Sequence, residues 1–194
     1  PSMTTASQAG VLHGQYDDLP AFYWYVKESR RLMASGRPSD LHDEERRLSN
    51  GRGLLAGDGM AVMALFSGDA ERSVMTTTRL VDDAGSLQVN PLDFYAYALD
   101  PYNVYRGLAG MVGEALLECW QAFRQWQQDV RPRTRRIGRF ALMRGGSNVL
   151  ARDATTWSVT LAMYQGRPII FCNYLGYDEV GHYAGPETRD ALGT

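Results

Sequence analysis

The strongest constraint on the fold comes from residues 147–172, where an amphipathic helical pattern runs directly into a short apolar strand. Between 147 and 165 the apolar side chains recur at helical spacing, and Gly166 follows as a stop signal. Residues 168–172 (Pro-Ile-Ile-Phe-Cys) are apolar and bounded by turn residues, which is typical of a buried strand. A helix that leads into a buried strand is the repeating unit of mostly parallel sheets. The sequence therefore predicts an α/β fold, a mostly parallel sheet with flanking helices, in which residues 60–66 form another buried strand.

The loop after the 168–172 strand carries a carboxylate and an imidazole four residues apart. Asp178 and His182 follow the carboxyl end of that strand, the edge at which open α/β sheets bind their ligands. If the chain makes a helical turn here, both side chains share one face and can hold one divalent metal, for which zinc accepts both donor types. The alternative is an ordinary exposed hydrogen bond between Asp178 and His182. Gly176 and Gly181 favour an irregular loop over a long helix.

Near the N-terminus, two threonines precede a run that can form a helix. Residues 6–12 are compatible with a helix, so Thr4 and Thr5 fall at its start. Free backbone N–H groups and the positive end of the helix dipole attract phosphate at such a position. A threonine hydroxyl there is a candidate nucleophile if a base or a metal activates it. The alternative is that one of the two threonines simply caps the helix.

These two segments resemble motifs of the alkaline phosphatase superfamily, in particular of its nucleotide pyrophosphatase/phosphodiesterase branch. The C-terminal segment matches an Asp-x-x-x-His-x-x-Gly-Pro pattern through Asp178, His182, Gly185 and Pro186. Residues 1–14 look like the nucleophile segment of that family, a turn that leads into a helix closed by glycine. A looser similarity, to a bacterial group of alkaline phosphatase-like proteins that are often joined to membrane segments, covers nearly the whole chain.

The resemblance implies a role for four residues. Thr4 matches the nucleophile that takes the phosphoryl group and is also a metal ligand, while Asp178 and His182 match two ligands of one metal. Ser7 stands where the branch usually has an asparagine that helps to hold the phosphoryl oxygens. A serine hydroxyl can still donate one hydrogen bond, but it reaches less far. Thr5 is the alternative nucleophile, although the register of the motif favours Thr4.

The function implied by the resemblance is that of a metal-dependent phosphoric ester hydrolase of the phosphodiesterase or nucleotide pyrophosphatase type. Its cofactor would be a divalent metal, zinc by the family pattern, with two ions in a complete domain. Its substrate would be a small phosphoester or nucleotide. Phosphomonoesterase and phosphotransferase activities stay open, whereas a sulfatase of this superfamily would need a cysteine or serine in place of Thr4.

The resemblance also implies that residues 1–194 are a single but partial α/β domain with a helical insertion at about 92–145. The family has an aspartate ligand before the nucleophile and further aspartate and histidine ligands after the second motif, and neither set is found in this sequence. We therefore expect an internal piece of a larger protein, completed by N- and C-terminal segments. On that expectation the isolated chain lacks a complete metal site, and its own sequence does not determine its location in the cell.

Composition excludes some classes of function. The chain has 194 residues, of which 44% are hydrophobic, so it can bury a core. Its formal net charge of -2 lacks the strong positive balance of nucleic-acid-binding proteins, and nucleic acid is not expected as a partner. No apolar run approaches the roughly 20 residues that span a bilayer. Cys119 and Cys172 fall in an expected helix and an expected strand, which favours buried thiols over a disulfide.

Three shorter segments add expectations. Residues 22–26 (Phe-Tyr-Trp-Tyr-Val) predict a strand whose aromatic side chains fill a core, the alternative being that they stack on a nucleotide base. A helix is expected to begin at Pro38 and to end before the turn at 50–53, with His42 on its solvated face. The turn at 67–69 (Ser-Gly-Asp) is a candidate for lining the active-site pocket, because such a turn follows the corresponding strand in the family.

The longest helix is expected between residues 103 and 127, where apolar side chains recur every three or four residues. An arginine-rich stretch follows, with Arg131, Arg133, Arg135, Arg136, Arg139 and Arg144. One interpretation is peripheral contact of residues 103–144 with an anionic membrane surface. The other is a helix packed on the domain with a solvated basic loop. The first interpretation allows a different function, a non-catalytic membrane-surface or interaction module in which the motif residues are vestigial.

Overall fold

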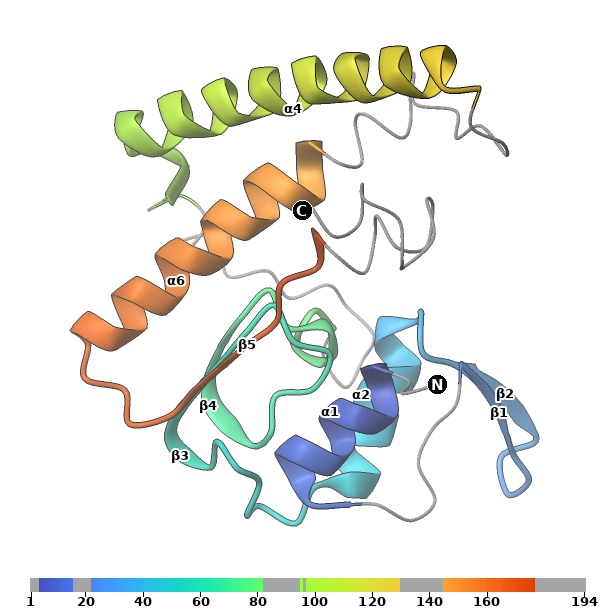
Figure 1. Cartoon of the computed structure of the whole chain (residues 1–194). Coiled ribbons are helices and arrows are strands. Elements are labelled where there is room, and N and C mark those ends of the chain that lie inside the picture. The colour runs from blue at the N-terminus through green and yellow to red at the C-terminus, as the bar shows by residue number, and fades with distance from the viewer. Residues whose placement is uncertain (1–3, 16–21, 82–94, 96, 130–144, 177–194) are drawn as a thin grey trace. The chain divides into compact units, whose positions relative to one another are not determined.

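The computed structural model of the chain describes residues 4–15, 22–81, 95, 97–129 and 145–176 (Figure 1). The chain divides into two compact units. Unit 1 consists of Pro1–Pro91 and Ser158–Asn173, and unit 2 consists of Leu92–Trp157 and Tyr174–Thr194.

Unit 1 contains a three-stranded parallel sheet in the order β4-β3-β5 (Figure 1). β3 spans Gly57–Val62, β4 spans Ala70–Val74 and β5 spans Ile170–Cys172. In the central strand, Met60 pairs with β4 on one side and with β5 on the other. The parallel sheet and its helices confirm the predicted α/β class.

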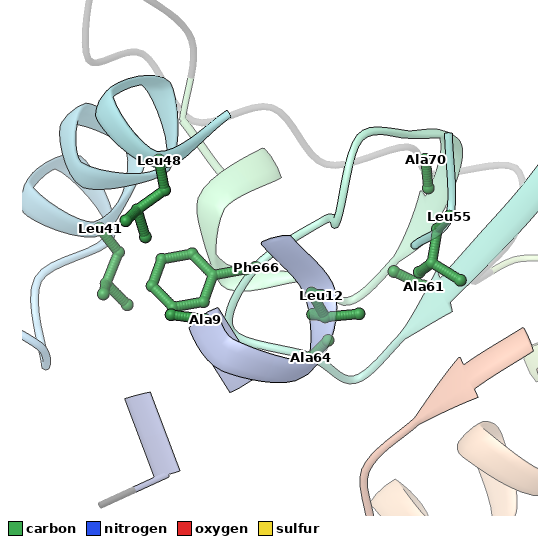
Figure 2. Close-up of a cluster of buried hydrophobic side chains, with 9 residues drawn as sticks. All are labelled: Ala9, Leu12, Leu41, Leu48, Leu55, Ala61, Ala64, Phe66 and Ala70. Carbon is green, nitrogen blue, oxygen red and sulfur yellow. The ribbon is translucent and has the colours of Figure 1, made fainter. Parts of the chain in front are cut away.

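Helices pack on both faces of this sheet. On one face, α1 (Thr4–His13) and α2 (Pro38–Leu48) bury a cluster of apolar side chains with β3 and its flanking loops, shown in Figure 2. The members of this cluster are Ala9, Leu12, Leu41, Leu48, Leu55, Ala61, Ala64, Phe66 and Ala70. On the other face, Ala162 of α6 (Arg152–Tyr164) packs with Met60 and Val62. Since successive strand residues point to opposite faces, β3 is buried on both sides, as is usual in parallel sheets.

β3 ends earlier than the apolar run at 60–66 predicts. The backbone turns at Met63, whose φ of 54° lies in the left-handed region. The carbonyl groups of the next two residues accept hydrogen bonds from N–H groups of η1, a 3-10 turn at Thr77–Arg79 that follows β4. The predicted strand is therefore wrong beyond Val62, because the backbone leaves the extended conformation at Met63 and the next two residues pair with η1 and not with a strand.

An antiparallel hairpin joins β1 (Tyr23–Val26) to β2 (Arg31–Ala34). The strand at 22–26 is confirmed, but the expected burial of its aromatic side chains is wrong. Tyr23 is 68% exposed and Tyr25 is 57% exposed. Within the described part of the chain this sheet has two strands only, and the buried side chains of the hairpin are those of Met33 and Ala34 in β2. Aromatic density therefore predicted the strand but not its burial.

In unit 2, α4 (Pro101–Gln127) is the long amphipathic helix that the sequence predicts. Asp100 caps its N-terminus, accepting a hydrogen bond of 2.9 Å from the N–H of Tyr102. α4 contacts η2, a π-helical segment at Gly145–Ala151 that runs into α6. Among the residues that the structure describes, no helix is long and apolar enough to cross a membrane.

The two cysteines are free thiols. Cys172 is partly buried in β5, and burial raises the pKa of its thiol. The expected burial of Cys119 is wrong, because this residue lies on an exposed side of α4.

Candidate functional site

α1 begins at Thr4, and its first turn exposes the two residues to which the family resemblance assigns catalysis (Thr4) and substrate binding (Ser7). Thr4 and Ser7 are exposed and are three residues apart, so they share one side of the helix. Thr5, the alternative nucleophile, is only 3% exposed. Among the two threonines, the accessible hydroxyl group therefore belongs to Thr4.

Contacts along α1 fix its direction relative to the sheet of unit 1. The side chain of Gln8, one turn after Thr4, accepts a hydrogen bond of 2.8 Å from the N–H of Leu65, which follows the carboxyl end of β3. At the other end of the helix, the carbonyl of Leu12 accepts a hydrogen bond of 2.7 Å from the N–H of Leu54, which precedes β3. α1 thus runs antiparallel to β3, and its N-terminal turn lies toward the carboxyl edge of the sheet.

β5 leads to the same edge. The N–H of Asn173, directly after β5, donates a hydrogen bond of 3.2 Å to the carbonyl of Val62 at the end of β3. Asp178 and His182 follow within ten residues but lie outside the described residues. Carboxylate and imidazole are donors that zinc accepts, so these side chains suit the expected metal chemically. The described residues contain no group of three or more histidine, cysteine, aspartate or glutamate side chains that could hold a metal.

A second polar centre, which the sequence did not predict, surrounds the carboxylate of Glu45. One oxygen of Glu45 accepts hydrogen bonds from His13 Nε2 at 3.2 Å, from the Ser67 hydroxyl at 2.9 Å and from the Gly68 N–H at 3.0 Å. Burial by itself raises the pKa of Glu45, but these bonds, led by that of His13, hold its pKa below the usual value. The residue is therefore a buried anion that joins α1 and α2 to the turn before β4.

Asp69 completes this centre. Its carboxylate accepts hydrogen bonds from the Ser49 hydroxyl and from the Gly53 N–H, the latter at 2.8 Å. Partial burial acts to raise the pKa of Asp69, while the bonds from Ser49 and Gly53 lower it below its usual value. His13 Nδ1 lies 4.0 Å from Asp69 and makes no hydrogen bond to the described residues. The imidazole thus stands between two carboxylates, in a buried position.

A cavity of about 260 Å³ opens beside this centre. The residues that line it are His42, Glu45, Arg46, Ser49, Ser67, Asp69 and Arg79. Two arginines face two carboxylates, so the formal charges of the lining balance. The turn at 67–69 does line a cavity, but it precedes β4 and therefore lies toward the amino edge of the sheet. His13 and Thr4 are also separated by about 13 Å along α1, which sets this cavity apart from the expected nucleophile.

His42 departs from the sequence prediction of a solvated side chain. It is partly buried, and its Nδ1 lies 2.9 Å from the carbonyl oxygen of Thr78. Because a carbonyl oxygen only accepts, Nδ1 carries the proton in this bond. The prediction is wrong because η1 packs against this side of α2, a contact between segments far apart in the sequence.

The sequence does contain a signal for the buried carboxylate. Glu45 lies four residues after Leu41 and three before Leu48, so it shares the apolar side of α2 with both of these core residues. A charged residue at such a position must find internal partners. The neighbouring charges of the helix concealed this signal, because the segment looks like an ordinary solvated charge run.

Comparison of the chain with known protein families, curated proteins and solved structures gives no match. The family resemblance therefore rests on the residues of the two motifs alone.

Proposed function

We propose that this chain is part of a metal-dependent phosphoric ester hydrolase, of the phosphodiesterase or nucleotide pyrophosphatase type found in the alkaline phosphatase superfamily. The observation that carries the proposal is the exposed hydroxyl of Thr4 on the first turn of α1, at the edge of the sheet toward which β5 also runs. The sequence after β5 contains Asp178 and His182, which are the other members of the proposed site.

In this proposal, the first turn of α1 binds the phosphoryl group. The first N–H groups of a helix have no partner within the helix, and its dipole favours negative charge at this end. Ser7, on the same exposed side as Thr4, donates a hydrogen bond from its hydroxyl to a phosphoryl oxygen. These donors hold the phosphorus close to Thr4 and stabilise the charge that develops during the reaction.

Thr4 then acts as the nucleophile. Its hydroxyl gives up its proton to water as its oxygen bonds to phosphorus, while the bond from phosphorus to the leaving oxygen breaks and that oxygen takes up a proton from water to leave as the alcohol or nucleotide. Water later attacks the phosphothreonine, releasing phosphate or phosphomonoester and restoring the hydroxyl. A divalent metal such as zinc, held by Asp178, His182 and Thr4, would favour the deprotonated threonine and neutralise phosphoryl charge.

Two substitutions at Thr4 test this proposal in the full-length protein that carries the chain. Thr4→Val keeps the shape of the side chain but removes its hydroxyl, and we expect the hydrolysis of bis-p-nitrophenyl phosphate to fall by about 10³-fold or more. Thr4→Ser keeps a hydroxyl and should retain measurable turnover. Because Thr4 is itself one of the proposed metal ligands, zinc content is measured in both variants and activity is compared with zinc in excess.

The proposed nucleophile is wrong if Thr4→Val hydrolyses the substrate about as fast as Thr4→Ser and the wild type. Circular dichroism of each variant checks that a loss of activity is not caused by unfolding. Thr4 is exposed, so neither substitution should change the melting temperature appreciably.

A further inference from the structure

α4 exposes its apolar side and buries its polar side. A stripe of apolar residues at three- and four-residue steps is exposed. Within it, Tyr105 is 72% exposed, Leu116 is 66% exposed and Trp126 is 65% exposed. This apolar stripe consists of Tyr105, Leu108, Val112, Leu116, Trp120, Phe123 and Trp126. On the opposite side, Asn103, Gly107 and Glu118 are buried. A helix that is packed on its own domain shows the reverse arrangement.

The glycine side of α4 is the side that contacts its own unit. A Cβ atom at Gly107 would lie 3.3 Å from Leu150, and one at Gly110 would lie 2.7 Å from Val149. Arg106 adds a hydrogen bond of 3.0 Å to the Asp153 carboxylate. The apolar stripe lies on the other side of the helix from these contacts, so α4 packs on its own unit through its glycine side and not through its apolar side.

The apolar stripe is built from the residue types that bind at a membrane interface. Trp120, Phe123 and Trp126 occupy its C-terminal part, and the rings of Phe123 and its two tryptophan neighbours lie about 6 Å apart. Tryptophan and tyrosine favour the boundary between water and acyl chains, while leucine and phenylalanine favour the acyl chains themselves. At 27 residues, α4 is about 40 Å long, and it is not apolar enough to cross the bilayer.

The charge next to the stripe favours an anionic lipid surface over a second copy of the chain. Residues 130–144 contain six arginines and neither aspartate nor glutamate. In the sequence, the first of these arginines, Arg131, follows four residues after the end of α4. Anionic lipid headgroups attract such a cluster. A second copy would bring the same arginines, while the two acidic residues within α4, Glu114 and Glu118, lie on its inner side.

We propose that α4 is a membrane-surface helix, which inserts its apolar stripe into the interface of an anionic bilayer. The helix lies in the plane of the membrane, with its glycine side toward the protein. This inference is independent of the proposed hydrolase activity, since none of its residues belongs to the proposed catalytic site.

Sedimentation of the whole chain with phosphatidylcholine vesicles that contain or lack phosphatidylserine tests the proposal. We expect binding to the anionic vesicles that weakens as salt is added, and much less binding to pure phosphatidylcholine. Trp126→Glu should reduce the partition coefficient on anionic vesicles about tenfold or more, because it puts a charge into the part of the stripe that enters the bilayer. Gln128→Glu introduces the same charge two residues later, off the stripe, and should bind within about fivefold of the wild type, the effect of one charge near the surface.

Three outcomes would overturn the proposal. The first is no binding to anionic vesicles at low salt, and the second is equal binding by Trp126→Glu and Gln128→Glu. The third is a wild type that binds no lipid but forms a concentration-dependent dimer in analytical ultracentrifugation, while Trp126→Glu stays monomeric. In that case a second copy of the chain, and not a membrane, covers the apolar stripe. Trp126 is exposed, so a folded variant is expected, and circular dichroism confirms it.

Discussion

At the scale of single residues, Glu45 shows how one buried charge can join three segments of unit 1. Its carboxylate accepts donors from α1 and from the turn before β4, while the residue itself belongs to α2. If the carboxylate is removed, several buried donors are left without a partner. The free energy of unfolding then falls by more than the net contribution of the lost hydrogen bonds, because each unpaired donor carries its full desolvation cost. Glu45 therefore has a larger effect on stability than its place in a charged helix suggests.

Glu45 also makes stability depend on pH. The pKa of Glu45 is lowered in the folded protein, so its contribution is fully present above the unfolded value of about 4.3 and is lost as pH falls through the lower folded value. We expect the wild type to lose stability below about pH 4. Glu45→Gln should be less stable at pH 7 by about 1–3 kcal/mol and should show a flatter acid limb in urea unfolding.

Glu71→Gln is the matched control for this prediction, because it makes the same chemical change on the exposed side of β4. It should leave the stability at pH 7 within about 0.5 kcal/mol of the wild type. Equal acid limbs for Glu45→Gln and the wild type would show that the buried carboxylate does not contribute to acid sensitivity. Asp69, whose pKa is also lowered, accounts for part of the slope that remains in Glu45→Gln.

At the scale of secondary structure, α4 approaches η2 closely at Gly110 but not at Gly113. A Cβ atom at Gly110 would lie 2.7 Å from Val149, which is 2% exposed and has little room to move, whereas a Cβ atom at Gly113 meets nothing within 4 Å. Gly113→Ala should stabilise the chain by about 0.8–1 kcal/mol, because alanine favours the helix. In Gly110→Ala the overpacking, about 1–3 kcal/mol, should outweigh that gain.

Thermal or urea unfolding followed by circular dichroism compares these two variants directly. The prediction concerns the sign of the difference, since both substitutions bring the same gain in helix propensity. If Gly110→Ala stabilises the chain as much as Gly113→Ala does, the contact between α4 and η2 is not close-packed in solution.

The helices were predictable from sequence because their signals are local. α2 begins at Pro38 as expected, and α4 follows the spacing of apolar residues. β4 was not predicted, because Glu71 and Arg72 interrupt any apolar alternation in a strand whose partner is found only in the folded sheet. The spacing also indicated that α4 has an apolar side. It did not indicate whether that side is buried or exposed, because this depends on the contacts of the helix glycines with η2.

At the scale of the whole molecule, the features of the candidate site that depend on local sequence could be predicted, and those that depend on contacts between distant segments could not. The parallel sheet, and the strand that leads to Asp178, follow from the alternation of helix and strand along the chain. The exposure of Thr4 and the burial of Thr5 depend on how α1 packs against β3. The centre around Glu45 brings together residues more than thirty positions apart, which no local pattern encodes.

Metal binding is the property of the whole molecule that the proposed site determines most directly. In the proposed site, Asp178 and His182 would give only two protein ligands besides Thr4, whereas structural zinc sites use four and catalytic sites use three. We therefore expect the isolated chain to retain less than one zinc ion after dialysis, measured by inductively coupled plasma mass spectrometry. Asp178→Asn and His182→Ala should each lower that content further, whereas His42→Ala, which removes an imidazole bonded to a backbone carbonyl, should not. One tightly held zinc ion that survives both ligand substitutions would place the metal elsewhere in the chain, and Thr4 would then lose the metal that its proposed role requires.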